Sequence, residues 1–289
     1  MILAPMALGT VIVDDSWADG GRNNGADATD TDWWYSTGST AIEVSVGSLG
    51  LVTGGSGRGI HGTFSSQTLG IGDTLTATFT FNTPATVTTI GQSTAFKIGL
   101  FDTTGHAGLA ADITASSGSP NAVYNNLNGY MMDLDVNMSG ASTNNISFRQ
   151  RSNAASGQLM ASTGDFLTLT NGGGDYTFAA STTGYKGVFS VKRTDTDMLD
   201  LTGALYLGNT LLSTFTGTDS NTIVNAFGML AFHVNSSTFG TSGTPGTANN
   251  GIDFSNIKIE YTAIPEPSTL ALAAIGLAGL MLAKFRNRR

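Results

Sequence analysis

Alternation between apolar and polar residues is the feature that most restricts what this chain can fold into. Every second residue is apolar in the segments 75–81, 132–138 and 257–261. Successive side chains of a β-strand point to opposite faces of its sheet, so this period is typical of strands with one buried face. We therefore expect half-buried strands at these three places.

Further apolar or β-branched runs, separated by turns rich in Gly, Asn and Asp, lie at 41–46, 96–101, 146–148, 166–169, 188–191, 204–207, 211–215 and 227–234. No helical period appears before residue 268. Charged residues make up only 12% of the chain, against about 25% in an average protein. So many short strands without intervening helices predict an all-β body, folded as an antiparallel jelly-roll-like β-sandwich over residues 14–261.

The end of the chain has a different pattern, an uncharged apolar stretch at residues 268–283. It is bounded by two groups of residues, a tripeptide of Pro265, Glu266 and Pro267 before it and a basic cluster of Lys284, Arg286, Arg288 and Arg289 after it. As a helix the stretch spans about 24 Å, which a snorkelling lysine extends toward the roughly 30 Å of a bilayer core. Basic residues after an apolar segment favour the cytoplasmic side, so the body should lie outside. We therefore expect a linker with the tripeptide at 262–267, a single C-terminal transmembrane helix at 268–285 and a basic cytoplasmic end at 286–289.

This order, IPEPST followed by an apolar helix and a basic end, resembles the PEP-CTERM sorting tail of Gram-negative bacteria that produce exopolysaccharide. The resemblance covers residues 264–289. It implies that an exosortase, a membrane-embedded cysteine transpeptidase, recognises Pro265, Glu266 and Pro267 and removes the helix. It also implies a route through the inner membrane, in transit, to the cell surface or extracellular matrix.

An exported chain needs a signal at its other end, where residues 1–13 are apolar without a preceding positive charge. Ala7, Leu8 and Gly9 resemble a small-x-small cleavage site. We interpret residues 1–13 as the remnant of a longer signal peptide, as the first strand, or as both.

Charge excludes one class of partner. Residues 1–263 carry 20 acidic and 9 basic side chains, and no stretch supplies the basic face that displaces counterions from phosphates. We therefore expect no nucleic-acid binding. The sequence has no cysteine, so neither disulfides nor thiolate metal sites hold the body together.

The closing stretch 252–261 and the segment 96–102 are similar to strands of concanavalin-like jelly rolls, a fold that invites a polysaccharide-hydrolase hypothesis. Such an enzyme needs two carboxylic acids beside the glycosidic bond. Of the three glutamates, Glu266 belongs to the tail, Glu260 alternates on the last strand and Glu43 stands alone. The paired E-x-D-x-x-E pattern of laminarinase-like hydrolases is absent, so we predict no catalytic residues and a non-enzymatic body.

Aspartates offer one candidate metal site. Asp133 and Asp135 point away from the apolar side chains of their strand, and an ordinary polar face accounts for them. Asp27, Asp30 and Asp32 lie in a loop-like stretch, and hard cations prefer several carboxylates on flexible backbone. We take these three as a candidate calcium site and expect no other cofactor.

All three tryptophans lie near the N-terminus. Aromatic faces stack well on the C–H faces of sugar rings, so Trp33, Trp34 and Tyr35 are candidate glycan contacts. The alternative is that they fill the core or cover an open sheet edge, because large aromatic side chains dominate core burial.

The segment 57–62 matches the G-x-G-x-x-G pattern of dinucleotide sites by letter. That motif works only where a strand turns into a helix, and residues 63–73 show no helical pattern. We expect a glycine-rich β connection there.

Together these features predict an exported cell-surface or extracellular-matrix protein, sorted by an exosortase-like transpeptidase and attached to the membrane through its C-terminal helix. Its body is expected to be structural or adhesive, with exopolysaccharide as a candidate partner. The alternative is a secreted polysaccharide-active enzyme of the jelly-roll class. The two differ in whether two carboxylates converge about 5 to 10 Å apart in a groove.

Overall fold

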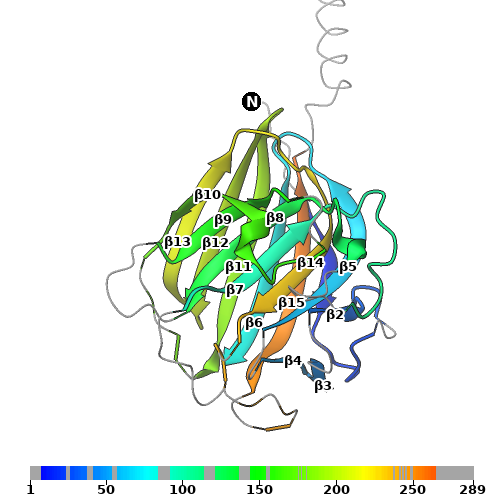
Figure 1. Cartoon of the computed structure of the whole chain (residues 1–289), viewed down its shortest axis with the longest axis vertical. Helices are drawn as coiled ribbons and strands as arrows, with labels where there is room; N and C mark the ends of the chain where they lie inside the picture. Colours follow the sequence, from blue (N-terminus) through cyan, green and yellow to red (C-terminus); the bar gives the residue numbers. More distant parts are fainter. Residues whose placement is uncertain are drawn as a thin grey trace, which may run out of the picture.

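The computed structural model describes residues 8–23, 27–37, 42–53, 57–83, 92–113, 121–136, 144–153, 157–174, 176, 178–179, 181–236, 238–240, 242, 244, 246–247 and 250–264. Within these residues, fifteen strands form two antiparallel sheets that stack face to face (Figure 1). The predicted all-β, antiparallel sandwich is confirmed.

The larger sheet has eight strands in the order β13-β12-β11-β6-β15-β4-β3, with β1 pairing to the end of β15. β15 is therefore paired along both edges, by β6 on one side and by β4 and then β1 on the other. The strand bounds are β1 Leu8–Asp15, β3 Ile42–Ser45, β4 Ser48–Val52, β6 Thr74–Thr83, β11 Ser181–Asp195, β12 Met198–Leu207, β13 Thr210–Asp219 and β15 Gly251–Ala263.

The second sheet has seven strands in the order β10-β9-β8-β7-β14-β5-β2. Two short 3₁₀ helices, Ala122–Tyr124 and Thr163–Asp165, lie in the connections from β7 to β8 and from β9 to β10. The strand bounds are β2 Trp33–Thr37, β5 Arg58–Thr68, β7 Gln92–Phe101, β8 Gly129–Val136, β9 Ile146–Arg151, β10 Phe166–Gly172 and β14 Ala226–Val234.

Aromatic side chains fill the space between the sheets. Phe79 of β6 meets Phe96 of β7 edge to face at 6.0 Å between ring centroids, and meets Phe232 of β14 at 5.1 Å. All three are fully buried, and burying such a ring contributes roughly 2–3 kcal/mol. β6 alternates between buried apolar residues and partly exposed threonines, as its sequence predicts.

The seven-stranded sheet is also buried on its outer face. There Phe101, Met131 and Met229 pack with apolar residues of the connections that cross the sheet. All eight residues of β8 are therefore buried, whereas the alternation at 132–138 predicts one exposed face. The expected polar face at Asp133 and Asp135 is wrong, because the covering connections bury both aspartates.

Three strands, β2, β4 and β5, are predicted neither by the alternation nor by the other apolar runs. β5 contains the glycine-rich segment 57–62, which is a strand rather than the start of a helix. An added Cβ at Gly59 would meet the Ser36 hydroxyl of β2, so a small residue allows the two strands to pair closely. β1 covers residues 9–13, and the signal-peptide interpretation of residues 1–13 stays a prediction.

Residues 265–289 lie outside the part of the chain that the structure describes. Within that part, no helix has the length and apolar character needed to cross a bilayer. The transmembrane helix at 268–285 and its basic end, with Lys284, Arg286, Arg288 and Arg289, stay predictions.

Candidate functional site

Trp33 lies in the main core. Its ring is fully buried and packs against Trp17 and Phe232, with centroids 6.2 and 6.3 Å away. Its indole nitrogen donates a hydrogen bond to Asp15 Oδ2 at 2.8 Å. In this structure Trp33 is a core residue and not a glycan contact, because its position on β2 turns it between the sheets.

Trp34 and Tyr35 are half-buried on the edge strand β2. The guanidinium of Arg22 lies over both rings, 5.6 Å from the Trp34 centroid and 5.3 Å from the Tyr35 centroid. A bidentate ion pair holds this arginine in place, with its two terminal nitrogens 2.6 and 2.7 Å from the carboxylate oxygens of Asp112. One face of each ring is thus covered by a cation, and a sugar contact there stays a prediction.

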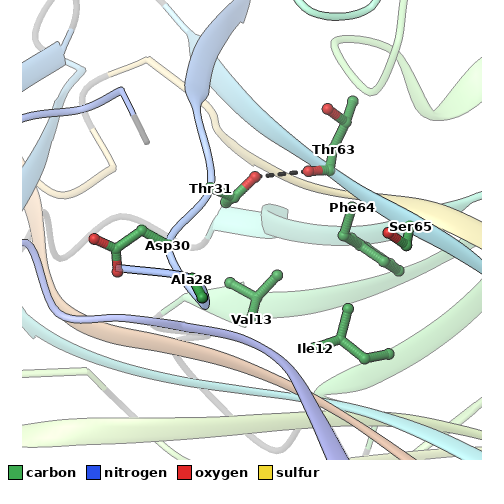
Figure 2. Close-up of a pocket in the computed structure, with 8 residues that line it drawn as sticks. All are labelled: Ile12, Val13, Ala28, Asp30, Thr31, Thr63, Phe64 and Ser65. Carbon is green, nitrogen blue, oxygen red and sulfur yellow. Dashed lines mark hydrogen bonds between the residues drawn. The ribbon is translucent and has the colours of Figure 1, made fainter. Parts of the chain in front are cut away.

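The loop at residues 27–31 is tied to both sheets. The Asp27 carboxylate accepts hydrogen bonds from the Thr29 N–H and hydroxyl at 3.1 and 3.0 Å, which closes a tight turn. The Asp14 N–H of β1 donates to the Thr29 carbonyl at 2.9 Å. The Thr31 hydroxyl donates to the Thr63 carbonyl of β5 at 2.6 Å (Figure 2). The loop therefore has a defined position above the space between β1 and β5.

Two cavities that share Ala28 and Asp30 lie beside this loop, and we call them together the Asp30 groove. The first has a volume of about 320 Å³. Figure 2 shows Asp30 and Ala28 on one side of it, Phe64 and Ser65 on the other, and Ile12 and Val13 along a third. The second has a volume of about 520 Å³, and Asp19, Asp27 and Asp30 are among the residues that line it.

The groove is strongly acidic. The pKa of Asp30 is raised, first by partial burial of its carboxyl group and then by the negative charges of Asp15, Asp27 and Asp19. The pKa of Asp27 is lowered by the hydrogen bonds from Thr29. Carboxylates accept hydrogen bonds and attract cations, so this groove fits a ligand that presents hydroxyl groups or positive charge.

Two of the three predicted calcium ligands, Asp27 and Asp30, line the groove. Asp19 lines that cavity with them, whereas Asp32 does not. In the described part of the chain, no three Asp, Glu or His side chains are arranged to hold a metal ion. Calcium at Asp27, Asp30 and Asp32 stays a prediction, and the structure offers it no preformed site.

A second candidate site joins residues from opposite ends of the chain. Glu43 of β3 and Asp253 of β15 both pair in register with Gly50 of β4. A Cβ at Gly50 would lie 2.7 Å from Asp253 Oδ1 and 3.3 Å from Glu43 Oε2, so the missing side chain lets the two carboxylates approach one another. Both line a cavity of about 520 Å³. The expectation that Glu43 stands alone is wrong, because the register of the sheet supplies its partner.

The two carboxyl groups of this pair have different surroundings. Glu43 accepts hydrogen bonds from the Gly246 N–H and from the Asn250 side-chain amide, the latter at 3.1 Å. Asp253 as a whole residue is exposed, yet its carboxyl group lies against Gly50. The pKa of Asp253 is raised by this partial burial and by the charge of Glu43. One stabilised carboxylate beside one carboxyl of raised pKa can divide the roles of base and acid.

A third group of charged residues is closed to ligands. Lys97, Asp133 and Arg149 meet on the outer face of the seven-stranded sheet, where Arg149 pairs with Asp133. Burial raises the pKa of Asp133 to about 6 and lowers that of Lys97 to about 8. Lys97 is 2% exposed and Asp133 is 1% exposed, so these groups serve packing rather than binding.

The end of the chain matches a known family model. Residues 263–289 match the PEP-CTERM protein-sorting motif. The predicted tail is thereby confirmed, and the PEP-CTERM tail begins where the described sandwich ends, since β15 closes at Ala263. The match covers Pro265, Glu266 and Pro267 and all four basic residues of the end.

No curated protein sequence matches the chain. Among solved structures, the sandwich is similar to the exoplasmic/lumenal domain of VIP36 in its Ca²⁺/Man₂-bound form, with 9% identity over 89% of each chain and a TM-score of 0.47. It is also similar to peanut lectin, with 9% identity over 91% of this chain and 100% of the lectin and a TM-score of 0.44. An endo-1,3-beta-glucanase from Streptomyces sioyaensis matches with 12% identity over 90% of this chain and 99% of the enzyme, at a TM-score of 0.46.

Proposed function

We propose that this chain is an exported protein that a PEP-CTERM tail delivers to the cell surface or extracellular matrix, where its sandwich binds polysaccharide through the Asp30 groove. The match at residues 263–289 supports the sorting step. A transpeptidase of the exosortase type takes Pro265, Glu266 and Pro267, and the helix at 268–285 holds the chain in the inner membrane until then.

Two properties of the Asp30 groove support the binding step. Its carboxylates are the hydrogen-bond acceptors that sugar hydroxyls need, and Asp30 is partly desolvated, which strengthens such a bond. The ring of Phe64 and the side chain of Ile12 supply an apolar wall for the C–H face of a sugar ring. Polar acceptors on one side and an apolar wall on the other form the usual pattern of a small-ligand site.

The sorting step is tested by expressing the full chain and a chain that ends at Ile264 in an exopolysaccharide-producing host and fractionating the cells. We expect the full chain in the membrane and surface fractions and the shortened chain in the periplasm or medium. Identical distributions of the two chains would reject the sorting role of the tail.

The binding step is tested by calorimetric titration of the folded body with purified exopolysaccharide and with neutral oligosaccharides. Asp30→Ala should weaken binding at least about tenfold, because it removes a charged hydrogen-bond acceptor. Asp197→Ala, in an exposed turn, is the matched control and should bind as the wild type does. Equal affinity in the wild type and Asp30→Ala would remove the groove from consideration.

A second candidate function, hydrolysis of a glycosidic bond, is favoured by the Glu43–Asp253 pair. Retaining glycosidases place two carboxyl groups about 5–5.5 Å apart, with the acid of raised pKa on one side. Here Asp253 would be the acid and Glu43 the nucleophile. Release of reducing ends from β-glucans or exopolysaccharide should disappear in Glu43→Gln and Asp253→Asn, and absence of release by the wild type would dismiss the enzyme.

A further inference from the structure

The tail leaves the sandwich from a strand that is paired on both sides. Thr262 pairs with Thr74 of β6 on one side and with Gly9 of β1 on the other. Ala263 still pairs with Leu8. The sequence predicts a linker at 262–267, yet the first two of these residues belong to the sheet.

Asp73, in the turn before β6, holds the next residue. The Ile264 N–H donates to Asp73 Oδ1 at 2.9 Å, while the Gly70 N–H, at 2.8 Å, and the Tyr261 hydroxyl donate to Oδ2. Burial opposes ionisation of Asp73, but these hydrogen bonds together lower its pKa. The carboxylate is therefore a stable anchor for the chain at its exit from the sandwich.

The side chain of Ile264 strengthens this anchor. It lies on the turn at Gly72, where an added Cβ would come within 3.1 Å of Ile264 Cδ1. Gly72 has a φ of +96°, a conformation that glycine adopts without strain. Asp73 itself is only 7% exposed. Backbone, carboxylate and apolar contact thus converge on the last residue before the Pro265-Glu266-Pro267 motif.

We propose that Asp73 is a clamp that holds Ile264, the residue before the sorting motif, on the sandwich and so limits capture of the motif by the transpeptidase. This inference rests on the proposed sorting function. A peptide-processing enzyme binds its substrate in an extended form on both sides of the recognised motif. Ile264 must therefore leave Asp73, and residues 262–263 must leave the β1–β15–β6 ladder, before the motif can enter the active site. Asp73 opposes the first of these steps.

The test follows conversion of precursor to processed protein in pulse-chase experiments with the full chain in a host that processes such tails. Asp73→Ala should raise the conversion rate by about fivefold. The variant loses the hydrogen bond from Ile264 N–H, and a bond of ordinary strength shifts the equilibrium for release of Ile264 by about that factor. A flexible Gly-Ser insertion of about six residues between Ile264 and Pro265 spans about 13 Å and should raise the rate as well, with the clamp intact.

Two further variants serve as a control and as a replacement for Asp73→Ala. Asp195→Asn changes a nearby aspartate that accepts a hydrogen bond from Thr196 N–H, and should process at the wild-type rate. Tyr261→Phe removes one hydrogen-bond donor to Asp73, and it takes the place of Asp73→Ala in the test if that variant fails to fold. Rates at or below the wild type in both the clamp variant and the insertion variant would overturn the clamp.

Failure of sorting is distinguishable from failure of the clamp. If the wild type is never processed, the proposed sorting function falls, and amide hydrogen exchange on the purified full chain then decides the clamp. The Ile264 amide should exchange slowly in the wild type and lose that protection in Asp73→Ala. Equally fast exchange in both proteins would contradict the clamp directly.

Discussion

Buried ionisable groups make the stability of this protein depend on pH. His61 of β5 is fully buried, and its Nε2 lies 2.7 Å from the Leu109 carbonyl oxygen, which it donates to. Its Nδ1 is buried with no partner among the described atoms, so a proton added there has no acceptor. Burial accordingly lowers the pKa of His61 from 6.5 to about 4.

The folded and unfolded chains protonate His61 at different pH values, and this difference sets how stability changes with pH. The unfolded chain takes up a proton below pH 6.5, whereas the folded chain does so only near pH 4, so stability is complete above pH 6.5 and is lost as the pH falls toward 4. The loss corresponds to about 3 kcal/mol. We expect His61→Gln to lose much less unfolding free energy between pH 7 and pH 4.5 than the wild type.

Urea unfolding at the two pH values measures this difference. His106→Gln, in the turn after β7, is the matched control for the loss of an imidazole ring. A pH dependence of His61→Gln equal to that of the wild type would show that another group is responsible.

Single residues were also the hardest part of the site to predict. The sequence places three aromatic residues side by side, but only the fold shows that Trp33 points into the core while Trp34 and Tyr35 meet Arg22. Asp27 and Asp30 come together because they are neighbours in one loop. Glu43 and Asp253 could not be paired from the sequence, because nothing local indicates that β3 and β15 flank the same strand.

At the scale of strands, the alternation was a reliable guide where a strand has one buried face. β6 and β15 follow it closely. It fails for β8, because the connections that cover the second face make every position buried. It also misses β4 and β5, whose glycines interrupt the apolar pattern although they allow close packing.

Close packing at a glycine gives a direct test of the larger sheet. Gly187 of β11 faces the fully buried ring of Phe79, which occupies the place of a Cβ. Gly187→Ala should lower the unfolding free energy by roughly 1–3 kcal/mol, because the ring has no free space to move into. Thermal unfolding measures the change.

Gly9 of β1 is the matched control. A Cβ there would meet only Thr262 Oγ1 at 3.6 Å, an ordinary contact. Gly9→Ala should change stability by less than about 0.5 kcal/mol, as surface substitutions usually do. Equal losses at the two glycines would mean that backbone freedom, rather than the Phe79 ring, sets the effect.

At the scale of the whole molecule, the boundary between sandwich and tail is sharp. A chain that ends at Ile264 keeps all of the described strands and the Asp73 anchor, so it should unfold in one transition. A chain that ends at Glu260 loses the Tyr261 and Ile264 bonds to Asp73 and the end of the β1 pairing. We expect it to melt about 5 °C lower or more.

Differential scanning calorimetry of the two chains measures this shift. Equal melting temperatures would place the structural boundary before Tyr261 and would argue that the anchor is dispensable for stability.

The position of β15 has a consequence for how the protein is made. The last strand of the body is an interior strand of its sheet, bordered by β6 on one side and by β4 and β1 on the other. The eight-stranded layer therefore cannot close until residues 251–263 have left the ribosome, so this sheet is completed late in synthesis. Pairing with this late strand is also what fixes β1, the earliest described strand, in the sheet.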